Sequence, residues 1–406
     1  MIKAGLNIGN SKISCIVCEY KDPKNIKILS LLSFPAKDIK KNIIVDYLSL
    51  TEEIKKLIND SEKNSQTKLN SININIPAVE SISEYYDSEI YLDNEKITDL
   101  HLNKAINKSI YFNKYENYIE TINNIIGYEL DNKLFYNEPI GNFAEKVKIF
   151  FYKLLINEKF LKNTINLIDK LKIDIENYIP SPLSSALATL SEDEKNLGTI
   201  CIDLGHTNTS TSIFENKHFI FGDSFMVGSN NVTNDIARGV STTITSAERL
   251  KTLYGSIISS PSDEHEIIEI PFISGENNKF TQISRSTINA IIKPRIEETL
   301  EIVWQNIKQN NLHNKKIKNV VITGGGSQLE GIIDYAKVIF SSNVRIGNPL
   351  EFLNLNDSFK KPTFSDVIGA TLFEKNEFSI NFIKKQPKKL KKLGFSGFIS
   401  WLDQYI

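Results

Sequence analysis

A short glycine-turn motif that occurs twice, about half the chain apart, restricts the fold more than any other feature of this sequence. Residues 5–12 (GLNIGNSK) align with residues 201–208 (CIDLGHTN), an offset of 196 in a chain of 406 residues. In both copies an apolar strand ends near Asn or Asp, turns through a glycine among small polar residues, and re-enters a strand, at 13–19 or 209–214. Each copy therefore predicts a β-hairpin with a glycine turn.

Two related hairpins at this spacing predict two similar α/β domains that face each other, with both glycine turns directed into the cleft between them. Backbone N–H groups in polar glycine turns form a concavity that binds anions such as phosphate. A third turn, Gly324, Gly325 and Gly326, follows the buried strand 319–323 and precedes a helix expected to begin near Gln328. Glycine permits close backbone approach, so a flat ligand can lie on this turn.

Hydrophobic periodicity predicts the remaining elements. Helices are expected at 43–56, 98–109, 158–171, 184–190, 230–239, 246–254 and 284–309, the last interrupted at Pro294. Strands are expected at 69–77, with one buried face, and at 147–156 and 264–272, and a turn is expected at 130–132, after the segment 118–126. The change of composition between residues 81 and 157 predicts a self-contained insertion.

Charge and cysteine content exclude several classes of protein. The 48 Lys and Arg residues balance 49 Asp and Glu residues, so no overall field attracts nucleic acid. Three cysteines are too few for a disulfide framework and indicate a reducing cytosol, and Cys15 and Cys18 are expected on opposite faces of one strand. Apolar runs such as 149–156 are far shorter than the roughly 20 residues of a spanning helix, and no signal peptide is expected.

The near-zero net charge conceals a basic C-terminal segment. Residues 384–406 contain six lysines and one aspartate, and the lysines precede an apolar stretch. One helical face of that stretch carries Phe398, Ile399, Leu402, Tyr405 and Ile406, and Trp401 flanks it. A short amphipathic helix after a polybasic stretch predicts an interfacial membrane anchor, in which each Lys near an anionic leaflet contributes about 1 kcal/mol. The alternative is a terminal helix that docks on the protein's own core.

The order of these motifs resembles the superfamily of actin, sugar-kinase and heat-shock-chaperone ATPases, and within it the FtsA family of bacterial cell-division proteins. The resemblance covers nearly the whole chain, with phosphate motifs at 5–13 and 203–210, connectors at 181–194 and 362–372, and an adenosine motif at 319–331. Two further stretches, 227–237 with 247–251 and 128–132 with 139–141, resemble segments that distinguish the FtsA family.

This resemblance implies an α/β fold of the actin-like ATPase type: two related α/β domains around a nucleotide cleft, an FtsA-type inserted subdomain and a C-terminal amphipathic helix. The implied first and second actin-like subdomains are 1–80 with 158–196 and 197–227 with 307–375. The other implied units are the insertion 81–157, a subdomain 228–306 that binds the tail of the tubulin-like protein FtsZ, a basic linker 376–397 and a membrane-targeting helix 398–406.

The resemblance also implies roles for individual residues. Two sets would wrap the β- and γ-phosphates of ATP from opposite sides: Gly9, Asn10, Ser11 and Lys12, and Gly205, His206, Thr207 and Asn208. Asp203 would hold Mg²⁺ or its waters, since Mg²⁺ keeps several waters and takes a carboxylate. Glu248 and Lys251 would contact the ribose and base edge, and Gly324, Gly325 and Gly326 would underlie the adenosine.

Three residues depart from the family pattern. Asn7 stands where the first motif usually carries Asp, Asn10 where it carries Thr, and Ser229 where Gly is usual. Asn7 and Asp203 are the candidate catalytic residues, but an amide cannot supply the charge that orients metal-bound water. With one fewer carboxylate in the site, we expect nucleotide binding with slow or absent hydrolysis.

The function implied is that of an ATP-binding actin homologue in cell division. It would polymerise with itself on the cytoplasmic face of the anionic inner membrane, tether FtsZ there and recruit later division proteins at the division site. Within 228–306, the basic candidates for an acidic FtsZ tail peptide are Arg285, Lys293 and Arg295. Each of them is also consistent with an ordinary solvated helix face.

Other members of the superfamily remain alternatives. A pilus-assembly relative such as PilM reaches the membrane through a partner peptide and lacks such a tail. A sugar or acetate kinase needs a catalytic carboxylate in the cleft and a substrate loop, neither of which the sequence reveals. A heat-shock chaperone needs a substrate domain after the ATPase, but fewer than 40 residues follow the second connector.

Overall fold

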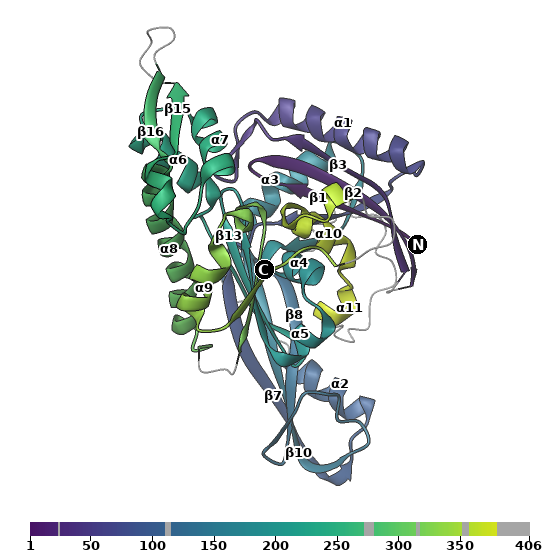
Figure 1. The fold of residues 1–406 in the computed structure, drawn as a ribbon. Helices are drawn as coiled ribbons and strands as arrows, with labels where there is room; N and C mark the ends of the chain where they lie inside the picture. Colours follow the sequence, from purple (N-terminus) through teal and green to yellow (C-terminus); the bar gives the residue numbers. More distant parts are fainter. Residues whose placement is uncertain (23–24, 110–114, 272–279, 314–316, 351–356, 380–406) are drawn as a thin grey trace.

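Two five-stranded sheets with the same topology form the body of the computed structural model, which describes residues 1–22, 25–109, 115–271, 280–313, 317–350 and 357–379 (Figure 1). The first sheet has the order β11-β6-β1-β2-β3 and the second β14-β13-β12-β17-β18. Their strands are β1 (Ile2–Ile8), β2 (Lys12–Asp22), β3 (Asn25–Pro35), β6 (Ser71–Ile76) and β11 (Asp174–Pro180), and β12 (Thr199–Leu204), β13 (Thr209–Glu215), β14 (His218–Phe225), β17 (Asn319–Thr323) and β18 (Asn343–Ile346).

The topology confirms the prediction of two related halves. In each sheet three consecutive strands form an antiparallel meander, β1-β2-β3 or β12-β13-β14. The first strand of each meander then pairs in parallel, β1 with β6 and β12 with β17. Both predicted hairpins are present, and their turns begin at Gly9 and Gly205.

Strand β6 is buried on both faces, so the prediction of a single buried face is wrong. Its isoleucines, at 72, 74 and 76, belong to the core of the first half. Asn73 and Asn75 alternate with them and are also buried, at 2% and 5% exposure. Asn73 Nδ2 donates to the carbonyl of Ala370 at 2.9 Å, and Asn75 Oδ1 accepts from Ser181 Oγ at 2.7 Å. The polar face therefore contacts segments between the two sheets, not solvent.

The two cysteines of β2 lie on opposite faces, as predicted. Cys15 packs in the core of the first half, whereas Cys18 packs in a separate cluster with Val367 and Ile368. Both thiols are free, and burial raises their pKa values, to about 11 for Cys15 and about 12 for Cys18. They are structural core residues.

Helices α1 (Tyr47–Ser65) and α3 (Glu158–Asp169) pack their apolar faces on the outer side of the first sheet. The sequence predicted that the first of them would start at residue 43, but Asp46 caps it by accepting from the backbone N–H groups of Leu48 and Ser49, both at 3.0 Å. The preceding residues form a small hairpin of β4 (Ile39–Lys40) and β5 (Ile43–Ile44) instead.

Two short helices join the halves. Helix α10 (Ser365–Leu372) lies against β1, β2 and β6 of the first sheet, and α4 (Ser181–Thr189) lies against β12, β13 and β14 of the second. The two helices pack directly on each other (Figure 1). Helix α5 (Glu192–Leu197) follows α4 and begins with a capping box of Ser191 and Glu194. Side chains on α10 and α4 can therefore contact residues of both halves.

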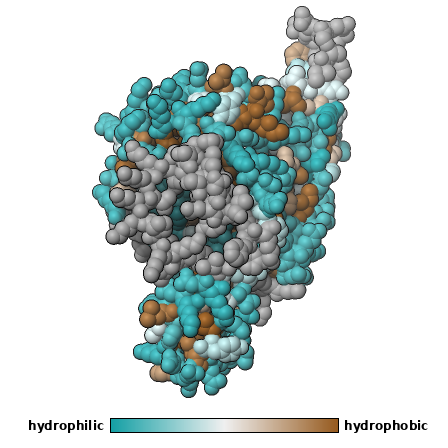
Figure 2. All heavy atoms as spheres, turned by 180° about the vertical axis from the view of Figure 1, so that it is seen from behind, coloured by the Kyte–Doolittle hydropathy of each residue, from teal (hydrophilic) through white to brown (hydrophobic). Residues whose placement is uncertain are grey.

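Residues 82–157 form a sheet of their own, of order β7-β10-β8-β9. Its elements are β7 (Ile82–Lys96), α2 (Asp99–Lys108), β8 (Tyr118–Leu130), β9 (Lys133–Phe135) and β10 (Phe143–Asn157). One end is attached to β14, where the Tyr152 hydroxyl accepts from the Gly222 N–H at 2.9 Å and Asn124 Nδ2 donates to the Phe219 carbonyl at 3.1 Å. The other end projects from the body and carries apolar side chains at its surface (Figures 1 and 2), with Tyr91, Leu100, Leu134 and Phe143 exposed.

The outer side of the second sheet is covered by α6 (Ser229–Gly239), α7 (Ile244–Tyr254), α8 (Arg285–Gln309) and α9 (Ile332–Phe340). A two-stranded sheet of β15 (Ile267–Pro271) and β16 (Phe280–Ser284) extends from the same side. Short 3-10 helices lie at Pro261–Glu264, Gly325–Gln328, Asp357–Phe359 and Pro362–Phe364, and α11 (Lys375–Phe378) follows α10.

Two helix predictions for this half are wrong. Helix α8 continues through Pro294, because Ile288, Ile292, Ile296 and Leu300 bury one continuous face on both sides of the proline. Helix α9 begins at Ile332 and not near Gln328, because Gly331 adopts φ +85°, outside the helical region, and the glycines before it form a 3-10 turn.

The C-terminal predictions lie mostly outside the described residues. The basic linker 376–397 is described only to residue 379, and the amphipathic helix 398–406 not at all. Among the residues that the structure describes, no helix is both long and apolar enough to span a membrane. The boundaries predicted for the subdomains stay predictions.

Asp223 on β14 lies where the inserted sheet, the second sheet and α8 meet. Its carboxylate accepts from Ser81 Oγ at 3.0 Å, from Asn306 Nδ2 at 3.0 Å and from the backbone N–H of Ser224 at 2.8 Å. Burial, partly offset by these hydrogen bonds, raises the pKa of Asp223 from 3.8 to about 6. The folded protein therefore binds this proton more tightly than the unfolded chain does.

The contribution of Asp223 to stability is expected to decrease as pH rises. It is fully present below about pH 4 and lost as pH rises through about 6, with a total change of at most roughly 3 kcal/mol. Urea unfolding of Asp223→Asn and the wild type between pH 4.5 and 7.5 checks this, since the variant should gain stability relative to the wild type with rising pH. Asp334→Asn, exposed on α9, is the control. A difference between wild type and Asp223→Asn that does not change with pH would contradict the prediction.

Candidate functional site

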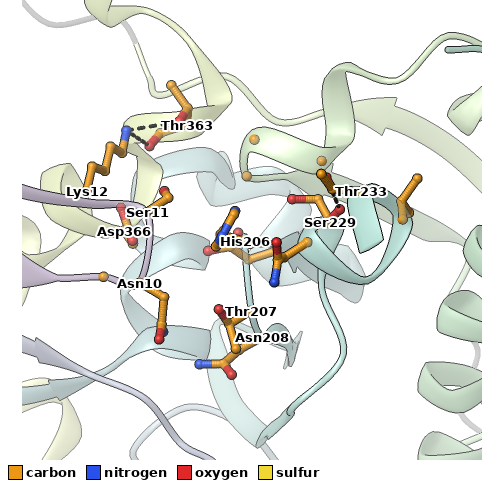
Figure 3. A pocket seen from close by; sticks show the side chains of 18 of the residues that line it. Asn10, Ser11, Lys12, His206, Thr207, Asn208, Ser229, Thr233, Thr363 and Asp366 are labelled. Carbon is orange, nitrogen blue, oxygen red and sulfur yellow. Dashed lines mark hydrogen bonds between the residues drawn. The ribbon is translucent and has the colours of Figure 1, made fainter. Parts of the chain in front are cut away.

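The two glycine turns face each other across a cleft of about 1060 Å³ between the halves (Figure 3). Every residue that the sequence assigned to nucleotide, metal or catalysis lines this one cleft: Asn7, Gly9, Asn10, Ser11, Lys12, Asp203, Gly205, His206, Thr207, Asn208, Glu248, Lys251, Gly324, Gly325 and Gly326. The structure thus brings together four segments, at 7–12, 203–208, 248–251 and 324–326. Their individual roles stay predictions.

The two turns have the same hydrogen-bonded geometry. Gly9 N–H donates to the Lys12 carbonyl at 3.1 Å, and Gly205 N–H donates to the Asn208 carbonyl at 3.0 Å. A Cβ atom on either glycine would lie within 2.9 Å of the carbonyl oxygen that closes its turn, so a side chain does not fit. Within the described part of the chain, the backbone N–H groups at 10, 11, 206 and 207 donate to no protein group. Both turns can therefore donate to an anion in the cleft.

Helix α6 begins directly on the second turn. The N–H of Ser229 donates to the Gly205 carbonyl at 2.9 Å, and that of Asn230 donates to the His206 carbonyl at 2.8 Å. A Cβ on Gly228 would lie 2.5 Å from the His206 carbonyl oxygen, so this close approach requires glycine. The helix fixes the shape of the turn.

An asparagine outside the predicted site connects the two turns. Asn42, between β4 and β5, donates its backbone N–H to Asn10 Oδ1 at 2.7 Å and accepts from Asn10 Nδ2 at 2.5 Å. Its side-chain amide also exchanges two hydrogen bonds of 3.1 Å with the amide of Asn208. We call this arrangement the Asn42 bridge. Asn42 has φ +62°, which asparagine tolerates better than most residues. No sequence pattern indicated that Asn42 contacts Asn208.

The charged centre of the cleft contains two carboxylates, although the sequence indicated one. Asp203 at the end of β12 accepts from Ser185 Oγ, and Asp366 in the first turn of α10 accepts from Asn7 Nδ2. The sequence analysis did not single out Asp366, because next to Ser365 it has the signature of an ordinary helix start. The expectation of slow or absent hydrolysis stays a prediction.

Burial and neighbouring charges shift the pKa values of this centre. Burial, assisted by Asp366, raises the pKa of Asp203 to about 7, against the opposing effects of Ser185 and Lys12. Burial also raises the pKa of Asp366 and lowers that of Lys12. Lys12 Nζ donates to the carbonyl oxygen of Thr363 at 2.6 Å and to its hydroxyl at 2.9 Å (Figure 3).

At the other end of the cleft, Glu248 and Lys251 of α7 form an ion pair of 2.8 Å. Lys251 Nζ also donates to Thr233 Oγ1 at 2.9 Å and to the Ser229 carbonyl at 3.2 Å, so both side chains are held against α6. Burial opposes the charged form of Glu248, but Lys251 lowers its pKa overall. Burial, with Lys251 nearby, lowers the pKa of His206.

The third glycine turn closes the cleft next to Asp203. Gly324 has φ +83°, and a Cβ there would lie 2.1 Å from Asp203 Oδ1. Gly325 differs, because its Cβ would lie 3.7 Å from Thr363 Oγ1 and meet nothing closer. Gly324 therefore permits the approach of the turn to the carboxylate, and Gly325 presents open backbone.

The three basic candidates for an acidic peptide lie outside the cleft. Arg285 pairs with Glu330 at 2.8 Å and with Glu266 at 3.3 Å. Arg295 pairs with Asp235 at 2.5 Å and also with Glu298. Lys293 is exposed on α8. The two arginines are thus already engaged with acidic side chains of the same chain.

Comparison with known sequences points to one family. The family model "Cell division protein FtsA" matches residues 200–369. FtsA of Agrobacterium fabrum is 28% identical over 380 residues, covering 91% of this chain and 86% of the relative. FtsA of Neisseria meningitidis is 26% identical over 367 residues, covering 90% and 88%, and FtsA of Escherichia coli is 23% identical over 380 residues, covering 91% and 90%.

Comparison with solved structures identifies the fold. The PilM-PilN type IV pilus biogenesis complex superimposes with a TM-score of 0.62 at 14% identity, covering 91% of this chain and 97% of the other. MreB5 of Spiroplasma citri bound to ADP gives 0.54 at 13% identity, covering 92% and 96%. At such identities the likeness concerns the fold alone. By its sequence relatives, which match over 91% of its length, and by its actin-like α/β fold, the chain is similar to the FtsA family of cell division proteins.

Proposed function

We propose that the chain binds ATP in the cleft, polymerises on the cytoplasmic face of the inner membrane, tethers FtsZ there and recruits later division proteins. The observation that carries the nucleotide assignment is the pair of facing glycine turns, whose N–H groups at 10, 11, 206 and 207 are available to an anion. Lys12 adds a positive charge on one side. A polyphosphate between the turns satisfies donors from both halves at once.

The chemistry of the cleft fits a magnesium nucleotide. The described residues contain no group of three or more acidic, His or Cys side chains suited to hold a metal alone. A carboxylate such as Asp203 is nevertheless what Mg²⁺ uses when waters and substrate phosphates complete its shell. Bound Mg²⁺ would neutralise phosphate charge. Glu248 and Lys251 line the same cleft and would contact the ribose, and Gly324, Gly325 and Gly326 would lie beneath the base.

A nucleotide that bridges both halves would fix the angle between them. A fixed angle gives every molecule the same pair of complementary surfaces, and a heterologous contact that does not close forms an open filament. Weak membrane contacts of many tails on one filament then add by avidity. The exposed apolar residues at the end of the inserted sheet, Tyr91, Leu100, Leu134 and Phe143, are candidates for contacts with later division proteins.

The membrane and FtsZ assignments rest on the sequence of the tail and on the family. The six lysines of 384–392 and the apolar face of 398–406 support an interfacial anchor. Curated relatives at 28% identity over 91% of the chain support cell division over the pilus-assembly alternative. For an acidic FtsZ peptide at 228–306, Lys293 is the exposed candidate, whereas Arg285 and Arg295 would have to exchange their present partners.

Two measurements test the proposal. Titration of a fluorescent ATP analogue should show saturable binding that Lys12→Ala weakens and unlabelled ATP displaces. Flotation with anionic vesicles should carry the protein upward, carry FtsZ only when the protein is present, and fail after deletion of 398–406. Absence of ATP binding would refute the nucleotide assignment, and flotation of the truncated protein would refute the anchor.

The Asn42 bridge yields a kinetic prediction. Asn42→Ala removes the side-chain hydrogen bonds to Asn10 and Asn208, each worth about 1 kcal/mol net, so nucleotide release is expected to accelerate about fivefold or more. Stopped-flow displacement of a fluorescent nucleotide measures this rate. Asn94→Ala is the matched control, since Asn94 also has positive φ, +53°, but is exposed on β7. Unchanged or slower release from Asn42→Ala would contradict a bridge that holds the turns together.

A further inference from the structure

We propose that Asp366 is the second carboxylate of the magnesium-nucleotide site, and that Asn7 is the residue that positions it. The proposal rests on the nucleotide function above. It assigns to the second connector the negative charge that the FtsA-like first motif carries at the position of Asn7. In this chain the amide of the hydrogen-bonded pair lies on β1 and the carboxylate on α10.

The geometry holds Asp366 at the edge of the phosphate site. Asn7, near the end of β1, is 8% exposed, and its Nδ2 donates to Asp366 Oδ2. The other oxygen, Oδ1, accepts from the backbone N–H of Val367 at 2.8 Å. Two hydrogen bonds therefore fix the carboxylate, which lies beside the first turn near Lys12 and Ser11 (Figure 3). Each carboxylate oxygen keeps a lone pair for a metal-bound water.

The charge balance of the cleft favours a cation between the carboxylates. Asp203 and Asp366 line the same cleft as Lys12. Among the described residues, no ion pair within 4 Å joins Lys12 to either of them, because Lys12 donates to Thr363. When both carboxylates are ionised, their charge exceeds that of the single Lys12 ammonium and repels phosphates bound at the turns. A divalent cation between the carboxylates offsets this repulsion.

A purely structural role for Asp366 predicts different behaviour. As a helix residue that only accepts from Val367, it would affect the stability of α10 and leave the metal dependence of nucleotide binding unchanged. As a site carboxylate, it repels phosphates without metal and favours them with metal. The ratio of the nucleotide affinity in Mg²⁺ to that in EDTA therefore distinguishes the two roles.

The experiment compares the wild type, Asp366→Asn, the double variant Asn7→Asp/Asp366→Asn, and the exposed control Asp334→Asn. Fluorescent ATP is titrated in Mg²⁺ and in EDTA, and Mn²⁺ binding is followed by electron paramagnetic resonance with ADP present. In the wild type and Asp334→Asn, metal should tighten ATP binding about tenfold or more. In Asp366→Asn this ratio should fall below about threefold, mainly because affinity in EDTA rises, and the Mn²⁺ signal should weaken.

The double variant keeps one amide and one carboxylate in contact but returns the carboxylate to β1. It should recover most of the metal dependence and the Mn²⁺ signal, and it supplies the comparison if Asp366→Asn folds poorly. A wild-type ratio in Asp366→Asn, or no recovery in a folded double variant, overturns the assignment of Asp366. If the wild type binds no ATP under either condition, the nucleotide function itself fails, and this inference fails with it.

Discussion

Gly369→Ala is expected to lower the free energy of unfolding by about 3 kcal/mol or more, the upper end for an added core methyl group. A Cβ at Gly369 would lie 1.8 Å from the carbonyl oxygen of Ser184 and 2.6 Å from its carbonyl carbon. Both are backbone atoms of α4, so no side-chain rotation relieves the clash. The helices α10 and α4 would have to separate, and with them the two halves that they join.

Urea or thermal unfolding measures the effect, and Gly127→Ala on β8 is the matched control. A Cβ at Gly127 would meet nothing closer than the Phe135 carbonyl oxygen at 3.4 Å, an ordinary contact. In a helix without such a neighbour, Gly→Ala raises the free energy of unfolding by roughly 0.5–1 kcal/mol. The loss of stability expected for Gly369→Ala is therefore opposite in sign to the intrinsic effect of the substitution. A melting temperature of Gly369→Ala equal to or above that of the wild type would show that α10 and α4 do not pack this closely.

Local pattern and repetition were enough to predict the architecture. The alternation in β1, β2, β12 and β13, and the glycines that end the first strand of each hairpin, are signals contained within about ten residues. Because the two copies share one pattern, the cleft between them followed from symmetry. The third turn completed the prediction of a ligand site, and all three turns do line one cleft.

The errors arose where tertiary contacts decide the outcome. The alternation in β6 indicated a solvent-facing side, but its asparagines contact Ala370 and Ser181, which the topology brings from elsewhere in the chain. Helix α8 passes Pro294 because packing on both sides outweighs one missing backbone hydrogen bond.

The site residues that the sequence did not indicate were missed for the same reason. Asp366 is 359 positions from Asn7, and Asn42 is 166 positions from Asn208. Asp366 meets Asn7 through the packing of α10 on β1, and Asn42 meets Asn208 across the two halves. A single sequence contains no local signal for such a contact, because neither periodicity nor turn propensity depends on a partner so distant. Motif residues were therefore predictable, and the residues that position them were not.

Gly324→Ala is expected to reduce nucleotide affinity at least tenfold and to lower the free energy of unfolding by about 1–3 kcal/mol. The added Cβ would lie 2.1 Å from Asp203 Oδ1, 2.7 Å from the Leu204 carbonyl oxygen and 2.8 Å from its carbonyl carbon. The backbone at φ +83° would also be strained by any side chain. Relief of the clash has to move the third turn or Asp203, and moving Asp203 disrupts its hydrogen bond with Ser185.

Gly325→Ala is the matched control, one residue further along the same turn. Its Cβ would meet only Thr363 Oγ1 at 3.7 Å, and it shares with Gly324→Ala the loss of one glycine and the gain of one methyl group. Fluorescent-ATP titration in Mg²⁺, with a thermal melt of each variant, separates the two positions. If both variants bind ATP as the wild type does, the third turn does not have to approach Asp203 for binding. If both variants lose ATP affinity equally, the turn requires glycine at both positions, and the close approach to Asp203 is not the cause. Loss at Gly324 alone would mean that the ligand site depends on the carboxylate position that this one close approach fixes.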